Sequence, residues 1–391
     1  MIGTCIIHFF IKLKIQQTKL MNLGALKLIN LFLRQLKTIS LFEKIKNWEQ
    51  WPFQVLYAPI APVWGWYMLR SGSVWFFTPS NPRLTFGGME GEPKREMHLL
   101  LPPHLCPVFF NVKPSDDFEL VLQKLEEKKI QLPFIVKPEV GGQGILFRKI
   151  ETLEQLKFYH SKVPAEYFIQ EFIDYPIEVS LFYYRHPTEE HGTISGFLQK
   201  IPLHVIGDGI HTLAELLRIN TKAKKRMDEL RTKHESNFNV VLAEGQKYML
   251  SYAGNHNRGA KFIDISGEKD ERLLNFLDEI SKKNDFFYGR YDIMCHSIDE
   301  MKEGKNFVIL EYNGCGAEPN HFYDTDYTLL NAYKEILKHW KVLYQISKYN
   351  KEHGIEYWPL WKGVRFLSKT KKYLKKIKAA DKIIPQDFSL I

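Results

Sequence analysis

The hydrophobic and polar positions of this chain follow different patterns before and after residue 85. From residue 100 onward, short apolar runs typical of strands alternate with longer amphipathic segments typical of helices. The predicted strands cover residues 134–137, 167–171, 288–293 and 307–312. The predicted helices cover residues 118–129, 213–217, 270–284 and 329–349. This alternation predicts a domain in which helices pack on sheets.

The first part of the chain has a different pattern. Residues 1–47 alternate apolar clusters with single basic residues, which predicts an amphipathic helix with a basic side. Lys12 and Lys14 interrupt the opening apolar run, and no small-residue cleavage site follows it. We therefore expect no secretory signal. Met21 is an alternative to Met1 as the start of translation.

Residues 51–69 contain no charged side chain, and this uncharged run is long enough to span a bilayer. Pro52, Pro59 and Pro62 lie inside it and disfavour a spanning helix. Five tryptophans gather between residues 48 and 75, and tryptophan prefers the membrane interface. We expect this segment to lie on a membrane surface or to be partly inserted. An aromatic-rich core is the alternative.

The net charge of +9 is concentrated at the two ends of the chain. Residues 1–47 carry +7 and residues 351–391 carry +6, which leaves −4 for residues 48–350. A slightly acidic body argues against a nucleic-acid-binding surface there. The basic ends, including a predicted basic helix over residues 369–378, favour contact with an anionic membrane surface. Solvated charge runs are the alternative.

The four cysteines show no metal-ligand spacing and no disulfide framework, which indicates a reducing cytoplasm. Cys315 directly follows an Asn-Gly pair, but no base partner is evident near it in the sequence. We therefore interpret Cys315 and Cys295 as packing residues. His211 and His321 are candidates for substrate contact, with a structural role as the more frequent alternative for each.

A short apolar strand delivers Lys137 directly into a glycine-rich turn that contains Gly141, Gly142 and Gly144. Glycines let a backbone approach a ligand closely, and successive N–H groups form an anion-binding nest. The pattern differs from a Walker motif because the lysine precedes the glycines. It predicts a phosphate-binding turn, although many glycine-rich turns after strands are only structural.

Two further strands carry polar side chains at alternating positions. Arg290 and Asp292 share one face of their strand, as do Glu311 and Asn313 on the other strand. Two carboxylates and an amide oxygen that converge from neighbouring strands form a hard oxygen site suited to Mg²⁺. Arg290 beside them would hold a phosphoryl group during transfer.

The motifs and their order along the chain resemble those of the ATP-grasp superfamily, and in particular those of its D-alanine–D-alanine-ligase-like and cyanophycin-synthetase-like members. The resemblance covers about residues 85–345 and implies an α+β fold, in which two subdomains with antiparallel sheets enclose ATP. The implied organisation is a basic, aromatic-rich region at 1–85, an ATP-grasp domain at 86–350 with lobes of about 86–170 and 171–350, and a basic tail helix at 351–391.

The resemblance also implies roles for individual residues. Lys94, Lys137 and the glycine-rich turn would hold the phosphates of ATP, and Glu178 would hold its ribose. The hinge that contacts adenine would consist of Gln170, Glu171, Phe172 and Ile173. The ligands of Mg²⁺, with Mn²⁺ as an alternative, would be Asp292, Glu311 and Asn313. The catalytic side chains would be Arg290 and Lys200, and the side chains facing the substrate would be Asn257 and Arg258.

The activity that the resemblance implies is phosphoryl transfer from ATP to a carboxylate, followed by attack of an amine on the acyl phosphate. The substrates would be small or peptide-like, and the reaction would take place in the cytoplasm, at the inner membrane face if the basic ends bind lipid. A kinase acting on a hydroxyl and a membrane-associated ATP-binding module without turnover are the alternatives. The oligomeric state is left open.

The chain departs from the family pattern at one position and in one region. Leu146 stands where the family usually has a further glycine, which predicts a stiffer turn. Residues 1–85 do not resemble the βαβ substrate-binding domain of the ligases, so specificity for D-alanine is not implied.

Overall fold

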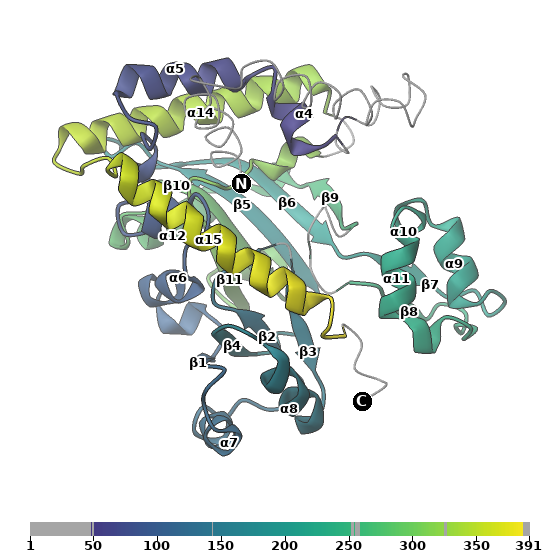
Figure 1. The fold of residues 1–391 in the computed structure, drawn as a ribbon. Coiled ribbons are helices and arrows are strands. Elements are labelled where there is room, and N and C mark those ends of the chain that lie inside the picture. Colours follow the sequence, from purple (N-terminus) through teal and green to yellow (C-terminus); the bar gives the residue numbers. More distant parts are fainter. Residues whose placement is uncertain are drawn as a thin grey trace, which may run out of the picture.

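The computed structural model describes residues 48, 51–142, 144–251, 254, 259–323 and 327–385. The amphipathic helix that we predict within residues 1–47 lies outside these ranges, as do Asn257 and Arg258. Within them, two antiparallel sheets dominate the molecule, and helices cover both (Figure 1).

The smaller lobe is built on a four-stranded sheet in the order β1-β4-β2-β3. Its strands are β1 (Phe109–Val112), β2 (Phe134–Pro138), β3 (Arg148–Ile150) and β4 (Tyr167–Glu171). Two amphipathic helices pack on this sheet, α7 (Phe118–Glu127) and α8 (Leu153–Lys162). Asp117 caps α7, and Thr152 caps α8 through a capping box with Gln155, so both helices begin where the sequence supplies a side-chain acceptor.

The larger lobe is built on a five-stranded sheet in the order β11-β10-β5-β6-β9. Its strands are β5 (Ile177–Tyr184), β6 (Thr193–Ile201), β9 (Lys261–Asp264), β10 (Tyr288–Cys295) and β11 (Phe307–Asn313). Side chains of β5 alternate between its two faces. Leu181 packs in a cluster with α12 (Glu271–Lys283), whereas Phe182 packs in a cluster with α14 (Leu329–Glu352). A short helix, α13 (Ile298–Lys302), joins β10 to β11.

An insert between β6 and β9 forms a separate cluster beside the larger lobe (Figure 1). It consists of two antiparallel strands, β7 (His204–Ile206) and β8 (Lys247–Met249), and of three helices that lie between them in the sequence, α9 (Leu213–Ile219), α10 (Thr221–Lys224) and α11 (Met227–Lys233). Its small core includes Leu213, Leu217 and Leu230. Thr212 caps α9 through a capping box with Glu215.

The aromatic segment near the start of the described chain is part of the core. The prolines divide it into α4 (Phe53–Tyr57) and α5 (Ala61–Ser71), and α5 packs against α14 (Figure 1). The ring of Trp64 meets Trp340 at 5.1 Å, and Tyr67 stacks on Tyr344 at 4.5 Å. Trp48, Trp64 and Trp75 are all buried.

The expectation that this segment lies on a membrane surface is therefore wrong for most of its aromatic side chains. The alternative, an aromatic-rich core, describes them correctly. The segment lacks charges because it covers the apolar face of a long helix. Trp66 is an exception, since 57% of it is exposed. Among the residues that the structure describes, no helix combines the length and the apolar character needed to cross a membrane.

The last helix, α15 (Leu360–Asp381), runs along both lobes (Figure 1). Near its beginning, Leu367 joins the aromatic core of the larger lobe, and Gly363 lies so close to Trp75 that a Cβ atom there would be 2.4 Å from the indole ring. Near its end, Ile377 and Ala380 join the core of the smaller lobe. The helix therefore connects the two lobes by packing on each of them.

Candidate active site

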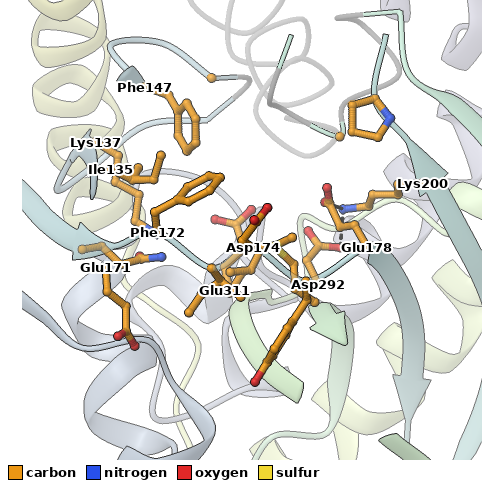
Figure 2. Close-up of a pocket in the computed structure, with 18 of the residues that line it drawn as sticks. Ile135, Lys137, Phe147, Glu171, Phe172, Asp174, Glu178, Lys200, Asp292 and Glu311 are labelled. Atoms are coloured by element: carbon orange, nitrogen blue, oxygen red, sulfur yellow. Dashed lines mark hydrogen bonds and ion pairs between the residues drawn. The ribbon is translucent and has the colours of Figure 1, made fainter. Parts of the chain in front are cut away.

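A cavity of about 380 Å³ lies between the two lobes (Figure 2). It brings together most of the residues that we predict to be functional. Its lining includes Lys94, Lys137, Gly141, Gly142, Gly144, Gln170, Glu171, Phe172, Ile173, Glu178, Lys200, Asp292 and Glu311. Arg290 and Asn313 do not line the cavity, but both lie on the strands that form its floor and contact Asp292.

Lys137 lies on β2 and is almost completely buried, with 8% of its surface exposed. Burial lowers the pKa of Lys137 to about 8, while Glu311 opposes this shift and Lys94 adds to it. A buried cation of this kind carries an unfavourable desolvation energy that an anion in the cavity would offset.

Lys94 is the first residue of α6 (Lys94–Leu100), and it holds that helix against the glycine-rich turn. Its Nζ donates a hydrogen bond of 2.7 Å to the carbonyl oxygen of Gly141, and its backbone N–H donates to the carbonyl oxygen of Glu139. The backbone at Gly144 has a φ of +71°, a conformation that glycine adopts more readily than other residues. Both lysines therefore lie at the turn that we predict to bind phosphate.

Leu146, at the position where the resemblance implies a glycine, has a left-handed backbone conformation that glycine adopts more readily. Its φ is +54°, its side chain is buried in the core of the smaller lobe, and its backbone is held at both ends. Its N–H donates to Asp381 Oδ1 at 2.8 Å, and its carbonyl oxygen accepts from the Tyr159 hydroxyl at 2.9 Å. A left-handed conformation costs a leucine about 1–2 kcal/mol. Burial and these two hydrogen bonds offset that cost, and they attach the end of the turn to α15.

The register of β10 and β11 places the polar residues opposite one another. Arg290 pairs with Asn313, and Asp292 pairs with Glu311. The register shifts directly after Asp292, which leaves Leu310 as an extra residue in β11. Because of this bulge, Leu310 and Glu311 both line the cavity although they are neighbours in the sequence.

Asp292 is the most strongly held carboxylate in the site. It accepts hydrogen bonds from Arg290 at 3.2 Å and from the Ser180 hydroxyl at 2.7 Å, and it pairs with Lys200 at 2.8 Å. Burial alone would raise the pKa of Asp292, but Arg290 and Lys200 outweigh burial and hold its pKa well below the usual range. Asp292 is therefore ionised, as a metal ligand must be.

Lys200 lies on β6 and bridges two carboxylates, with Glu178 Oε1 at 3.0 Å as its second partner. Burial would lower the pKa of Lys200, but Asp292 and Glu178 outweigh burial and raise it. Burial also raises the pKa of Glu178, an effect that Lys200 opposes. Figure 2 shows these three side chains together, across the cavity from Lys137.

The oxygen donors near Asp292 suit Mg²⁺ better than a transition metal. The group consists of two carboxylates, Asp292 and Glu311, and the side-chain amide of Asn313. Among the described residues, no three histidine, cysteine, aspartate or glutamate side chains are grouped to hold a metal. Mg²⁺ commonly binds one or two carboxylates together with phosphate oxygens, so this donor set fits an ion that arrives with a nucleotide.

One part of the cavity is apolar. Its side chains come from both lobes, and Figure 2 shows Phe147 and Phe172 on the same side as Lys137. The apolar lining residues that the sequence did not predict include Ile135, Phe147, Met294 and Leu310. Ile135 and Met294 lie two positions from Lys137 and Asp292 on the same strands, so strand alternation could have identified them.

The insert also contributes to the cavity, through Lys247 and Met249 on β8. No spacing in the sequence indicated these two residues. His211 does not line the cavity. It is exposed in a turn, where its Nδ1 lies 2.6 Å from Asp208. His321 is buried beside Glu335 on α14, 3.4 Å from its carboxylate, and does not line the cavity either.

The buried cysteines fit their interpretation as packing residues. Burial raises the pKa of Cys295 to about 11, and it also raises the pKa of Cys315. Both side chains are therefore neutral thiols at pH 7, and a neutral thiol is a poor nucleophile.

The arrangement of the two lobes agrees with the fold that the motifs imply. Two subdomains with antiparallel sheets enclose one cavity, with the glycine-rich turn and its lysines on one wall and the polar ends of β10 and β11 on the other. The chain has an α+β fold of two subdomains with antiparallel sheets, and this part of the expectation is confirmed.

Comparison with known proteins gave matches only among solved structures. No family model and no curated protein matches the sequence. The chain is similar to a bifunctional glutathione synthetase from Pasteurella multocida, with 14% identity over 63% of this chain and 36% of that chain, and a TM-score of 0.34. The chain thus spans little more than a third of that protein.

Two of the similar structures are shorter ligases. One is VanG D-Ala:D-Ser ligase from Enterococcus faecalis, with 14% identity over 66% of this chain and 62% of that chain, and a TM-score of 0.38. The other is D-alanine–D-alanine ligase from Bacillus anthracis complexed with ATP, with 14% identity over 67% of this chain and 68% of that chain, and a TM-score of 0.38. Sequence identities and TM-scores this low assign no activity to the chain.

Proposed function

We propose that this protein is an ATP- and Mg²⁺-dependent ligase that joins a carboxylate to an amine and forms ADP. One observation carries the proposal. A single cavity has a buried cation, Lys137, on one wall and two carboxylates suited to Mg²⁺, Asp292 and Glu311, on the opposite wall. This arrangement suits a polyphosphate and its metal ion.

In this proposal the parts of the cavity bind different parts of ATP. Lys94, Lys137 and the N–H groups of the glycine-rich turn bind the phosphates. The apolar part, with Ile135 and Phe172, takes the adenine, and Glu178 accepts hydrogen bonds from the ribose hydroxyls. Asp292, Glu311 and Asn313 hold Mg²⁺, which neutralises charge on the phosphates during transfer.

The reaction has two steps. An oxygen of the substrate carboxylate attacks the γ-phosphorus, the bond to the β-phosphate oxygen breaks, and ADP leaves. The amine nitrogen then attacks the carbonyl carbon of the acyl phosphate, loses a proton and expels inorganic phosphate. Arg290 stabilises charge on the transferred phosphoryl group, and Lys200 is a further phosphate contact. The enclosed cavity protects the acyl phosphate from water.

The test uses the full chain with ATP, Mg²⁺ and the small-molecule fraction of a cell extract. We expect ADP to form together with a product whose mass equals that of an acid plus an amine minus water. Glu311→Gln should abolish ADP formation without unfolding the protein, because Glu311 faces the cavity. Glu303→Gln, at an exposed site directly after α13, is the matched control and should react normally.

Three outcomes would contradict the proposal. Normal ADP formation by Glu311→Gln would reject the metal site. A product heavier than a hydroxyl compound by one phosphoryl group would identify a kinase. ATP binding without ADP formation, under any mixture of acids and amines, would identify a binding module without turnover. Because the reaction consumes ATP, the proposal places the protein in the cytoplasm.

A further inference from the structure

The side of α15 that faces away from the protein is strongly cationic. Between Leu360 and Asp381 the helix has eight basic residues and one acid. The acid, Asp381, pairs with the buried guanidinium of Arg148 at 2.9 Å and faces the smaller lobe. The basic residues are all exposed, and they are Lys362, Arg365, Lys369, Lys371, Lys372, Lys375, Lys376 and Lys378. We call these eight residues the cationic face.

The spacing of the basic residues arranges them in two rows along the helix. One row follows steps of three and four residues and contains Lys362, Arg365, Lys369, Lys372 and Lys376. The second row contains Lys371, Lys375 and Lys378, and Lys382 continues it directly after the helix. At 1.5 Å per residue, the helix is about 33 Å long. Its outer side therefore presents an elongated band of positive charge.

The protein holds this band in a fixed position and does not neutralise it. Gly363, Leu367, Ile377 and Ala380 are buried against the two lobes, so α15 cannot turn its basic side inward. In the part of the chain that the structure describes, no carboxylate pairs with any residue of the cationic face. The charge is also local, because residues 48–350 carry a net charge of −4.

Large apolar side chains lie at one end of the same helix. Leu360 and Trp361, its first two residues, are 46% and 67% exposed. Trp361 precedes the first basic residue of the cationic face by one position. Tryptophan and leucine at the end of a basic helix are typical of segments that lie in the interface of a membrane.

We propose that the cationic face binds the anionic surface of a membrane, with Leu360 and Trp361 entering the interfacial layer. The helix would lie flat, so that both rows face the lipid phosphates. A membrane fits better than a nucleic acid because the band is an unbroken convex helix surface and ends in exposed apolar side chains. The proposal does not depend on the enzymatic activity, and it replaces the aromatic segment before residue 78 as the membrane contact.

The strength of binding follows from the number of cations. Each basic residue near an anionic surface contributes about a fivefold gain in affinity at low salt, and salt screens this gain. Neutralising four residues of the cationic face removes four such factors and should thus weaken binding at low salt by about two to three orders of magnitude. Trp361→Ser should have its larger effect at high salt, because the apolar contribution is not screened.

The experiment is co-sedimentation of the full chain with vesicles of phosphatidylcholine, with or without 30% phosphatidylserine, at low and high salt. The test variant replaces Lys369, Lys372, Lys375 and Lys376 by glutamine. The matched control replaces four exposed lysines on other elements by glutamine and causes the same change in net charge. These control positions are Lys128, Lys157, Lys282 and Lys305. Circular dichroism and thermal unfolding establish that both variants are folded.

We expect the protein and the control variant to sediment with anionic vesicles at low salt, and the α15 variant to lose at least nine-tenths of this binding. Equal binding by the α15 variant, equal loss in the control variant, or no binding to vesicles by the unmodified protein would each overturn the proposal. Binding of a fluorescent RNA or DNA oligonucleotide through the same four lysines, without binding to vesicles, would identify a nucleic-acid surface in its place.

Discussion

The unusual ionisation of Lys137 gives a quantitative test of its role in ATP binding. Its pKa of about 8, compared with an ordinary value of 10.5, arises mainly from burial. If ATP phosphates bind beside it, they favour the charged form and return the pKa to about 10 or above. ATP binding at pH 8 should then take up about 0.5 proton, and at pH 9 about 0.8 proton. Because only the charged form binds well, affinity should fall roughly eightfold from pH 7.5 to pH 9.

The assay is isothermal titration calorimetry of Mg²⁺ and ATP in pairs of buffers that differ in ionisation enthalpy. The second ionisation of a phosphate has a pKa of about 6, so ATP itself contributes little above pH 7.5. Lys137→Met should bind weakly at every pH and without proton uptake. Lys137→Arg keeps a charge that does not titrate in this range, so any binding that remains should not depend on pH. Proton uptake close to zero, together with constant affinity from pH 7.5 to pH 9 in the unmodified protein, would refute the proposed phosphate contact.

Three further substitutions test the supports of the site. Leu146→Gly removes backbone strain but also a buried side chain, so we expect a loss of about 2 kcal/mol in the free energy of unfolding and a larger change in turnover than in ATP affinity. Unchanged turnover would contradict the prediction that Leu146 stiffens the turn. Asp381→Asn removes the charged partner of Arg148 and should lower the free energy of unfolding by about 1–3 kcal/mol in urea, whereas exposed Asp299→Asn should not. Lys94→Ala should weaken ATP binding less than Lys137→Ala in calorimetry, because Lys94 is only partly buried and water can replace it; the reverse order would exclude our assignment of the two lysines.

Strand alternation predicted the local structure of the site well. It indicated that Arg290 and Asp292 share one face, and the register of β10 and β11 places them opposite Asn313 and Glu311. The predicted strand at residues 167–171 coincides with β4, and the helix predicted at residues 270–284 differs by one residue at each end from α12, because Asp270 serves as its cap. The spacing of apolar residues and the capping of helices depend on residues that are close together in the sequence. Both can therefore be predicted from a single sequence.

The parts that the sequence could not predict depend on contacts between distant segments. The uncharged run before residue 70 has the composition of a membrane segment, and only the apolar face of α14 explains its burial. The bulge that exposes Leu310 to the cavity is a property of strand pairing. The anchoring of Leu146 by Asp381 joins positions 235 residues apart, so no local pattern could indicate why a leucine adopts a glycine-like conformation.

A crystal structure with Mg²⁺ and a non-hydrolysable ATP analogue tests the central claim most directly. We expect the phosphates to lie between Lys94 and Lys137, the metal ion to contact Asp292 and Glu311, and the adenine to occupy the apolar part of the cavity beside Phe172. A nucleotide bound outside this cavity, or one whose phosphates lie away from Lys137 with no metal ion at Asp292 and Glu311, would contradict it.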